Sequence, residues 1–332
     1  MTAPLDVPGA AEEAQPEAVA QTGGTRDRGR SLGQIAWMRL RKDKVAMTGG
    51  AFVVLMALVA LFAPLIVSLL GHPPNQWNRE MIDPALGTPM GPMGGMSGEH
   101  LFGVEPVTGR DIFSRIVYGA RISMLIGFLA TLVSVVIGTF MGIIAGYFGG
   151  WVDALISRLM DIFLAFPLLL FAMALVGVLP DAAFGLQDNA LRIAILVFII
   201  GFFNWPYIGR IIRGQTLSLR EREFVEASRS LGASNFYILR KELLPNLVAP
   251  ILVYSTLLIP TNILFEAALS FLGVGVEPPT ATWGGMLSEA VDYYDSAPNF
   301  MLAPGLAIFL TVLAFNLFGD GLRDALDPRT QS

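Results

Sequence analysis

Six long stretches with almost no charge constrain this chain more than any other feature of its sequence. A helix needs roughly 20 apolar residues to cross a bilayer, at a rise of about 1.5 Å per residue. The stretches cover residues 46–70, 122–148, 162–179, 193–208, 247–273 and 300–319, and Glu266 is the one charged residue within them. We therefore expect an all-α polytopic membrane protein with six transmembrane helices, the third reaching back toward Asp153 and the fourth continuing to Ile212.

The composition excludes several other classes of protein. Charged residues make up 15% of the chain, whereas soluble domains carry about 25%. Cysteine is absent, which excludes disulfides, thiolate metal sites and cysteine nucleophiles. His72 and His100 are the only histidines, and from so few we expect no multi-histidine metal site. The chain also lacks a G-x-x-x-x-G-K-[ST] phosphate loop. We expect it to have no catalytic residue, cofactor, metal or nucleic-acid partner of its own.

Basic residues are spread unevenly, and this sets the expected orientation. Most of the 22 Lys and Arg residues precede the first stretch, follow the fourth or lie near the C-terminus, while the loop 274–299 has none. Loops rich in Lys and Arg stay in the cytoplasm, so we expect both termini there. Residues 1–25 contain no Lys or Arg, which excludes a signal peptide.

These features predict five successive regions. A basic, disordered cytoplasmic tail (1–43) precedes the first transmembrane helix (44–71) and an extracytoplasmic loop with an amphipathic helix (72–118). A core with five transmembrane helices (119–320) contains a cytoplasmic loop (213–245). A cytoplasmic tail (321–332) ends the chain.

Glycines and one acid stand out inside the predicted helices. Gly138, Gly142, Gly146 and Gly150 recur every four residues, and such a row lets another helix approach closely. Burying the charge of Glu266 costs about 2.5–3.5 kcal/mol on insertion scales. We therefore expect Glu266 to face protein or water, either paired or protonated inside the bundle.

Residues 109–124 have the pattern of an amphipathic helix. Asp111, Arg115 and Arg121 fall on one face with other polar residues, and the opposite face is apolar. We expect this helix, with Arg110 just before it, to lie along the outer membrane interface ahead of the second transmembrane helix.

The loop after the fourth stretch has the clearest local signals. Ser218, followed three residues later by Glu221, forms a capping box that predicts a helix start, and Gly232 predicts its end. Ser234 then predicts the cap of a second short helix that stops at Pro245. Small and apolar side chains form one stripe on the first helix: Phe224, Ala227, Ser228 and Leu231. We interpret this helix pair as a docking element for a cytosolic partner.

Several motifs resemble those of a known family. Glu226-Ala227-Ser228, Gly232 and Leu244-Pro245 resemble the EAA signature of permease subunits in binding-protein-dependent ABC importers. Further motifs resemble the dipeptide and oligopeptide branch: Gly109-Arg110-Asp111, Gly119-Ala120-Arg121-Ile122-Ser123, Trp205-Pro206 and Ser270-Phe271-Leu272-Gly273-Val274-Gly275. The resemblance covers roughly residues 30–328 and favours the C-type subunit. Ser228 stands where a second alanine is usual.

The resemblance implies a type I importer (MetI-like) fold in the bacterial plasma (inner) membrane, with this chain forming half of a pathway for di- or oligopeptides. It implies a second homologous permease, an extracytoplasmic binding protein, surrounding lipid and two ABC ATPase subunits that bind ATP and Mg²⁺. It also implies that the loop 213–245 couples to the ATPase. The residues concerned are Glu223, Phe224, Glu226, Ala227, Ser228, Leu231, Gly232, Ala233, Leu244 and Pro245.

Other interpretations remain open from the sequence. Glu266, Trp283 and Met286 are candidates for the pathway or an outer gate. The same architecture could import nickel chelates or another small solute. A secondary transporter would favour inverted repeats and several intramembrane ionisable groups, and neither is visible. A membrane enzyme would need a nucleophile–base pair or metal cluster, which we do not find.

Overall fold

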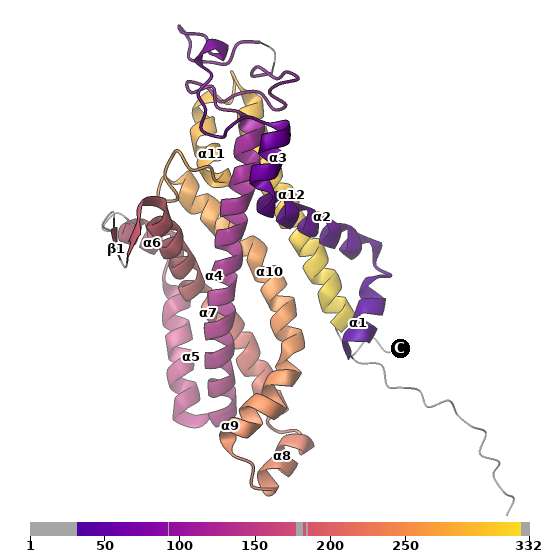
Figure 1. Cartoon of the computed structure of the whole chain (residues 1–332). Helices are drawn as coiled ribbons and strands as arrows, with labels where there is room; N and C mark the ends of the chain where they lie inside the picture. The colour runs from indigo at the N-terminus through magenta and orange to yellow at the C-terminus, as the bar shows by residue number, and fades with distance from the viewer. Residues whose placement is uncertain (1–31, 92, 177–181, 184, 327–332) are drawn as a thin grey trace, which may run out of the picture.

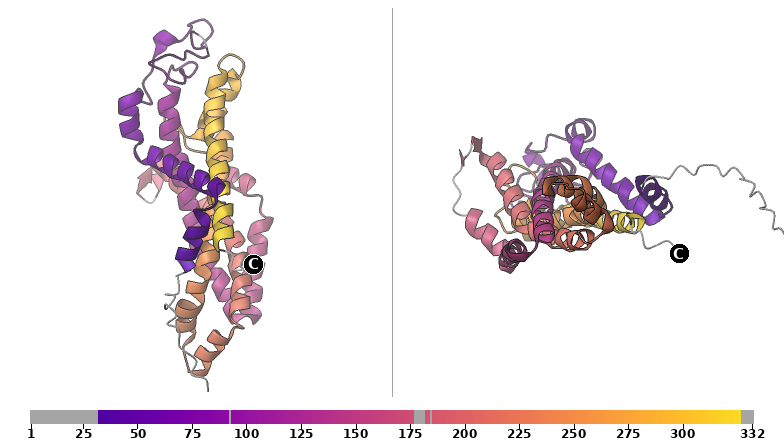
Figure 2. Two further views of the ribbon diagram at one scale, coloured as in Figure 1. Left: turned by 90° about the vertical axis from the view of Figure 1, so that its right-hand side faces the viewer. Right: turned by 90° about the horizontal axis from the view of Figure 1, so that it is seen from below.

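The computed structural model describes residues 32–91, 93–176, 182–183 and 185–326, and these form an elongated bundle of helices (Figures 1 and 2). The helices are α1 (Leu32–Leu40), α2 (Lys44–Leu61), α3 (Ala63–Leu70), α4 (Ile112–Phe148), α5 (Gly150–Ala165), α6 (Leu168–Val176), α7 (Asp188–Leu219), α8 (Glu223–Ser230), α9 (Asn235–Tyr237), α10 (Leu244–Phe271), α11 (Trp283–Ala290) and α12 (Pro298–Leu326). Short 3₁₀ turns lie at Arg79–Met81 and Val291–Tyr293, and a π-helical segment covers Ile238–Leu243. An antiparallel pair of short strands, β1 (Ala182–Ala183) and β2 (Leu186–Gln187), precedes α7.

Among the described residues, five helices are long and apolar enough to cross a membrane, and α5 with α6 makes a sixth if the bent pair counts as one span. This confirms the predicted helical membrane fold. The first predicted span is divided between α2 and α3, because the helix ends at Leu61 and restarts with Pro64 in its first turn. Proline is tolerated there, since the first helical N–H groups have no intrahelical partner.

The third predicted span contains a sharp bend. The axes of α5 and α6 differ by 77°. Pro167 follows Phe166, whose backbone is extended with φ −75° and ψ 126°. Because a proline disfavours helical geometry in the residue before it and donates no N–H, the helix ends here and α6 starts in a new direction.

The predicted glycine row brings α4 and α7 into close contact. A Cβ atom added to Gly138 would lie 2.6 Å from the Trp205 carbonyl oxygen, and one added to Gly142 would lie 2.7 Å from that of Gly209. Gly146 meets α7 in the same way, whereas Gly150 has a φ of +53° and starts α5 instead. Three of the four glycines therefore serve the predicted backbone contact between helices.

A buried row of hydrogen bonds joins three helices near the middle of the bundle. Asn204 in α7 donates to the Asn262 side-chain oxygen at 2.8 Å, and Asn262 in α10 donates to Thr131 Oγ1 in α4 at 2.9 Å. Polar side chains that bond across helices help to hold membrane bundles together, with measured contributions of about 0.6 kcal/mol on average.

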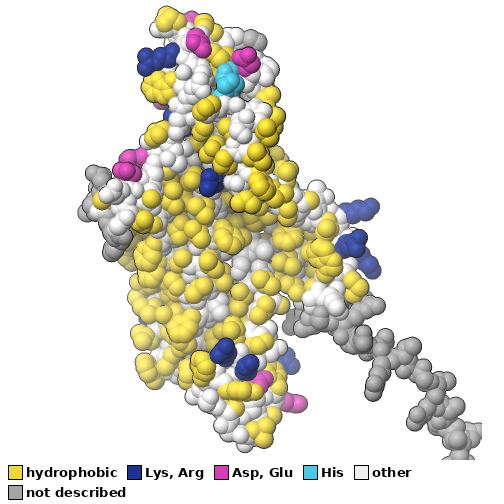
Figure 3. Space-filling model, in the orientation of Figure 1, with side chains coloured by type: hydrophobic (Ala, Val, Ile, Leu, Met, Phe, Trp, Pro, Cys, Tyr) yellow, Lys and Arg dark blue, Asp and Glu magenta, His cyan; other side chains and the backbone are white. Residues whose placement is uncertain are grey.

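The two ends of the bundle differ in what they carry. At one end α8 and α9 project beyond the other helices, and at the opposite end the 71–111 loop lies close to α3 and α11 (Figure 1). We call these the α8 end and the α11 end. In Figure 3 the surface between them is largely hydrophobic, while Lys, Arg, Asp and Glu side chains gather toward the ends and the right-hand edge. This distribution suits a chain whose middle lies in lipid.

The amphipathic segment at the α11 end differs from its prediction. Residues from Ile112 onward belong to one continuous 37-residue helix, α4, rather than to a separate helix along the interface. Asp111 is its N-cap and accepts a hydrogen bond from the Ser114 backbone N–H at 2.8 Å. Asp111 and Arg115 are buried, while Arg121 is exposed. Most of the polar face therefore packs against protein, because the loop and α11 supply partners that are distant in sequence.

Candidate functional site

The candidate site is the helical corner at the α8 end, which we define as residues 223–237. Gly232 has φ +80° and ends α8 as predicted, and Ser234 Oγ caps the next turn by accepting from the Tyr237 N–H at 3.3 Å. The predicted capping box is wrong, because Ser218 lies inside α7 and α8 begins at Glu223 without a side-chain cap. The long helix α7 continues to Leu219 and so includes Ser218, which the capping box placed at the start of a separate helix.

The predicted stop at Pro245 is also wrong. Helical structure continues from Asn235 to Phe271, with Pro245 in the first turn of α10. The preceding π-helical segment explains this, since the Leu244 N–H bonds to the Leu239 carbonyl five residues back. A π segment shifts the hydrogen-bond pattern by one residue, and the missing N–H of proline then interrupts no regular α-helical ladder.

Most predicted coupling residues face outward. Leu231 is 87% exposed, and Phe224 is 37% exposed although both are large apolar side chains. Phe236, which the sequence reasoning missed, is 70% exposed. Among the ten predicted residues, Ser228 and Ala233 are half-buried and the others are exposed: Glu223, Phe224, Glu226, Ala227, Leu231, Gly232, Leu244 and Pro245. The corner thus presents an apolar surface with acidic residues beside it.

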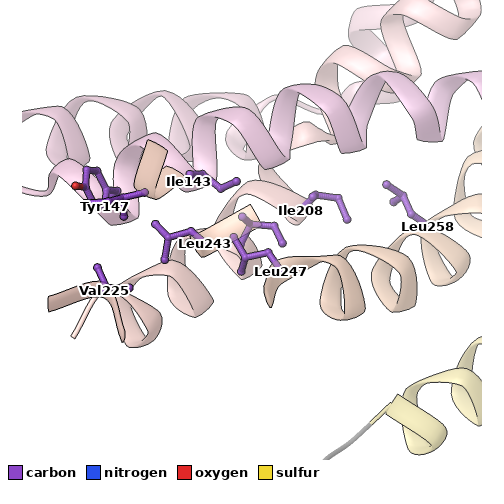
Figure 4. Close-up of a cluster of buried hydrophobic side chains, with 9 residues drawn as sticks. Ile143, Tyr147, Ile208, Val225, Leu243, Leu247 and Leu258 are labelled. Atoms are coloured by element: carbon purple, nitrogen blue, oxygen red, sulfur yellow. The ribbon is translucent and has the colours of Figure 1, made fainter. Parts of the chain in front are cut away.

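A small core fixes the corner to the bundle. Val225, the one fully buried residue of α8, packs with Leu243, Leu247 and Ile143 in a cluster that joins α8, α10 and α4 (Figure 4). Burying a valine stabilises a fold by roughly 1.5–3 kcal/mol. The predicted stripe of Phe224, Ala227, Ser228 and Leu231 did not include Val225, because Val225 lies on a different side of α8 and is buried.

Polar contacts reinforce this attachment at the end of α4. Tyr147 donates its hydroxyl proton to Asn235 Oδ1 at 2.8 Å, and the Arg229 guanidinium lies 5.2 Å from the centre of the Tyr147 ring. Ser228 Oγ donates to Glu242 Oε1 at 3.2 Å. A force applied to α8 would therefore reach α4 and α10 through side chains that touch both helices.

Of the three candidates for a pathway or gate, Trp283 and Met286 belong to α11, and Glu266 belongs to α10. Glu266 is fully buried, accepts a hydrogen bond from Ser270 Oγ at 2.8 Å and interacts with the Thr282 hydroxyl. Trp283 is fully buried and donates from Nε1 to the Ile116 carbonyl oxygen at 3.0 Å. Met286 is also buried, and borders a cavity of about 130 Å³. These contacts hold α11 against α4 and α10, and a role in gating stays a prediction.

A charged cluster lies beside α11. Glu105 is buried and pairs with Arg115, and its second oxygen accepts from Arg110 Nε at 2.6 Å. Arg110 also reaches Glu289 of α11 at 3.0 Å. The pKa of the Glu105 carboxyl is raised, chiefly by burial, although the Arg115 and Arg110 guanidiniums act to lower it. The sequence identified both arginines but not the acid that joins them.

Comparisons with known proteins agree with this architecture. Residues 138–332 match the family described as binding-protein-dependent transport system inner membrane component, and residues 31–87 match the N-terminal transmembrane domain of oligopeptide transport permease C. A dipeptide transport system permease protein, DppC of Alkalihalophilus pseudofirmus, is 44% identical over 90% of both chains. A glutathione transport system permease protein, GsiD of Escherichia coli O6:K15:H31, is 43% identical over 88% of this chain and 89% of its own.

A solved structure shares the fold. It is an inward-facing conformation of the MetNI methionine ABC transporter, with a TM-score of 0.53 and 20% identity, and the match covers 65% of this chain and 98% of that one. The two matched regions, these relatives and the helical fold described above all agree on the family. This chain belongs to the binding-protein-dependent transport system inner membrane components, as a permease of the oligopeptide permease C type.

Proposed function

We propose that this chain is one permease half of an ABC importer and that its corner at residues 223–237 docks on an ATPase subunit. The observation that carries the proposal is the exposed apolar surface around Leu231, which the buried Val225 anchors to the bundle. Large apolar side chains gathered at a projecting tip favour a protein partner. Docking there would couple nucleotide binding to movement of α4 and α10.

The substrate that we propose is a short peptide. Two relatives at 44% and 43% identity carry names for dipeptide and glutathione transport, and both cover about nine tenths of this chain. A binding protein outside the membrane, a second permease and two ATPase subunits would complete the assembly. Segments rich in Lys and Arg stay on the cytoplasmic side, so we place the chain in the inner membrane with the α8 end and both termini in the cytoplasm.

The test is transport by the reconstituted assembly with all its subunits. We expect uptake of a labelled dipeptide to require both ATP and the binding protein, and to persist when an uncoupler removes the ion gradient. Replacing ATP by ADP in the same vesicles is the matched control. Uptake that does not depend on ATP but is abolished by the uncoupler would show a secondary transporter instead. Competition by unlabelled glutathione and by nickel chelates ranks the possible substrates.

A further inference from the structure

Two histidines that are 28 positions apart in sequence meet at the α11 end. His72 follows the end of α3, and His100 lies in the 71–111 loop. Their imidazole rings stack with centroids 4.4 Å apart and an interplanar angle of 29°. His100 Nδ1 lies 2.9 Å from Asp111 Oδ1, at the start of α4. Three segments of the chain therefore contribute one potential metal ligand each.

The three side chains are held in place by the surrounding backbone. The His72 N–H donates to Ser114 Oγ at 3.0 Å, and Ser114 Oγ donates to Asp111 Oδ2 at 2.6 Å. The His100 N–H donates to Ser97 Oγ at 3.0 Å. His72 Nδ1 is shielded from solvent and has no hydrogen-bond partner among the described residues. A buried nitrogen without a partner needs a reason, and a bound ion is one such reason.

From this arrangement we propose that His72, His100 and Asp111 bind a divalent transition metal ion of the zinc, nickel and copper class. One ligand atom from each residue lies within 4.8 Å of the others. Metal–nitrogen bonds of about 2.0–2.1 Å place tetrahedral ligands roughly 3.4 Å apart, so the most widely separated ligand atoms would move closer by up to about 1.4 Å to bind one ion. Imidazole nitrogens select these metals over magnesium and calcium, which prefer oxygen ligands.

The proposed ion would act as a brace. It would tie the end of α3, the 71–111 loop and the N-terminus of α4 to one centre. Histidine atoms reach the surface in this part of the molecule (Figure 3). Three protein ligands would leave the fourth tetrahedral position to water. The sequence expectation that no metal site exists relied on the small number of histidines. The fold brings both of them, and a carboxylate, to one place.

Metal binding to the intact assembly tests this proposal independently of transport. The assembly is purified with an affinity tag that contains no histidine, stripped with EDTA and equilibrated with Zn²⁺ or Co²⁺. We expect one ion for each copy of this chain, a visible absorption band for Co²⁺ with nitrogen ligands, and a higher melting temperature with Zn²⁺. In His72→Ala and His100→Ala we expect at least a tenfold weaker affinity, because even outer-shell partners of a metal ligand contribute 10- to 100-fold.

Two comparisons keep the test decisive. Glu99→Gln removes the charge of an exposed acid beside His100. The variant assembly should bind the metal as tightly as the natural assembly does. The metal-free His72→Ala assembly should melt at the same temperature as the metal-free natural assembly, which separates loss of a ligand from loss of the local fold. Equal Zn²⁺ binding by His72→Ala and the natural chain, or no stoichiometric binding by the natural chain, would overturn the site.

Discussion

Replacing Gly232 by leucine should reduce ATP-dependent uptake at least tenfold while the chain still inserts and assembles in the membrane. Gly232 has φ +80°, which costs a residue with a side chain roughly 1–2 kcal/mol. None of the described residues has an atom within 4 Å of the Cβ that would be added, so the new side chain projects outward from the corner. A docking partner would meet both the added bulk and the altered turn.

The matched control for Gly232→Leu is Gly150→Leu. Gly150 also has a positive φ, +53°, and also has open space around its Cβ, but it starts α5 and does not belong to residues 223–237 of the corner. Both variants carry similar backbone strain, and only the first changes the proposed docking surface. Gly232→Asn provides a milder change, because asparagine tolerates this backbone conformation, and should retain part of the uptake. Equal uptake by Gly232→Leu and Gly150→Leu would contradict the coupling role.

Replacing Glu105 by glutamine should destabilise the α11 end by about 3–5 kcal/mol, the usual cost of removing one partner from a buried ion pair. Glu105 is buried and is the acid to which both Arg110 and Arg115 pair. Arg115 would keep its hydrogen bond to the Pro279 carbonyl oxygen at 3.0 Å but lose its ion-pair partner. We expect a large fall in melting temperature in detergent and faster proteolysis of the 71–111 loop.

Glu289→Gln is the control for this second variant. Glu289 contacts the same Arg110 but its side chain is 34% exposed, and exposed ion pairs contribute about 0–1 kcal/mol. The melting temperature should therefore change little. If Glu289→Gln and Glu105→Gln lowered the melting temperature equally, burial of the pair would not be what stabilises this end.

Those parts of the fold that one local pattern decides could be predicted from the sequence. Uncharged apolar stretches indicated the membrane helices, because a bilayer leaves few alternatives to a helix. The spacing of Gly138, Gly142 and Gly146 predicted a close helix contact, and Gly232 predicted the end of α8. Each of these depends on neighbouring residues in the chain rather than on the tertiary fold.

The errors arose where distant segments override a local signal. Ser218 has the spacing of a helix cap, but α7 continues through it while packing on the glycine row of α4. The polar face that contains Arg115 predicted contact with water at the membrane interface. Arg115 is instead buried in an ion pair with Glu105, which lies ten residues earlier. The hydrogen bonds between Asn204, Asn262 and Thr131 likewise join three helices that no local pattern connects.

Cross-linking at the corner tests the central claim most directly. The chain has no natural cysteine, so Leu231→Cys introduces a single reactive thiol at an 87% exposed position. In the intact assembly, a short thiol–amine cross-linker should join this position to an ATPase subunit in high yield. The same change at the exposed Glu99, at the opposite end, should give no such product. An unlinked corner in an assembly that still transports with ATP would contradict the account.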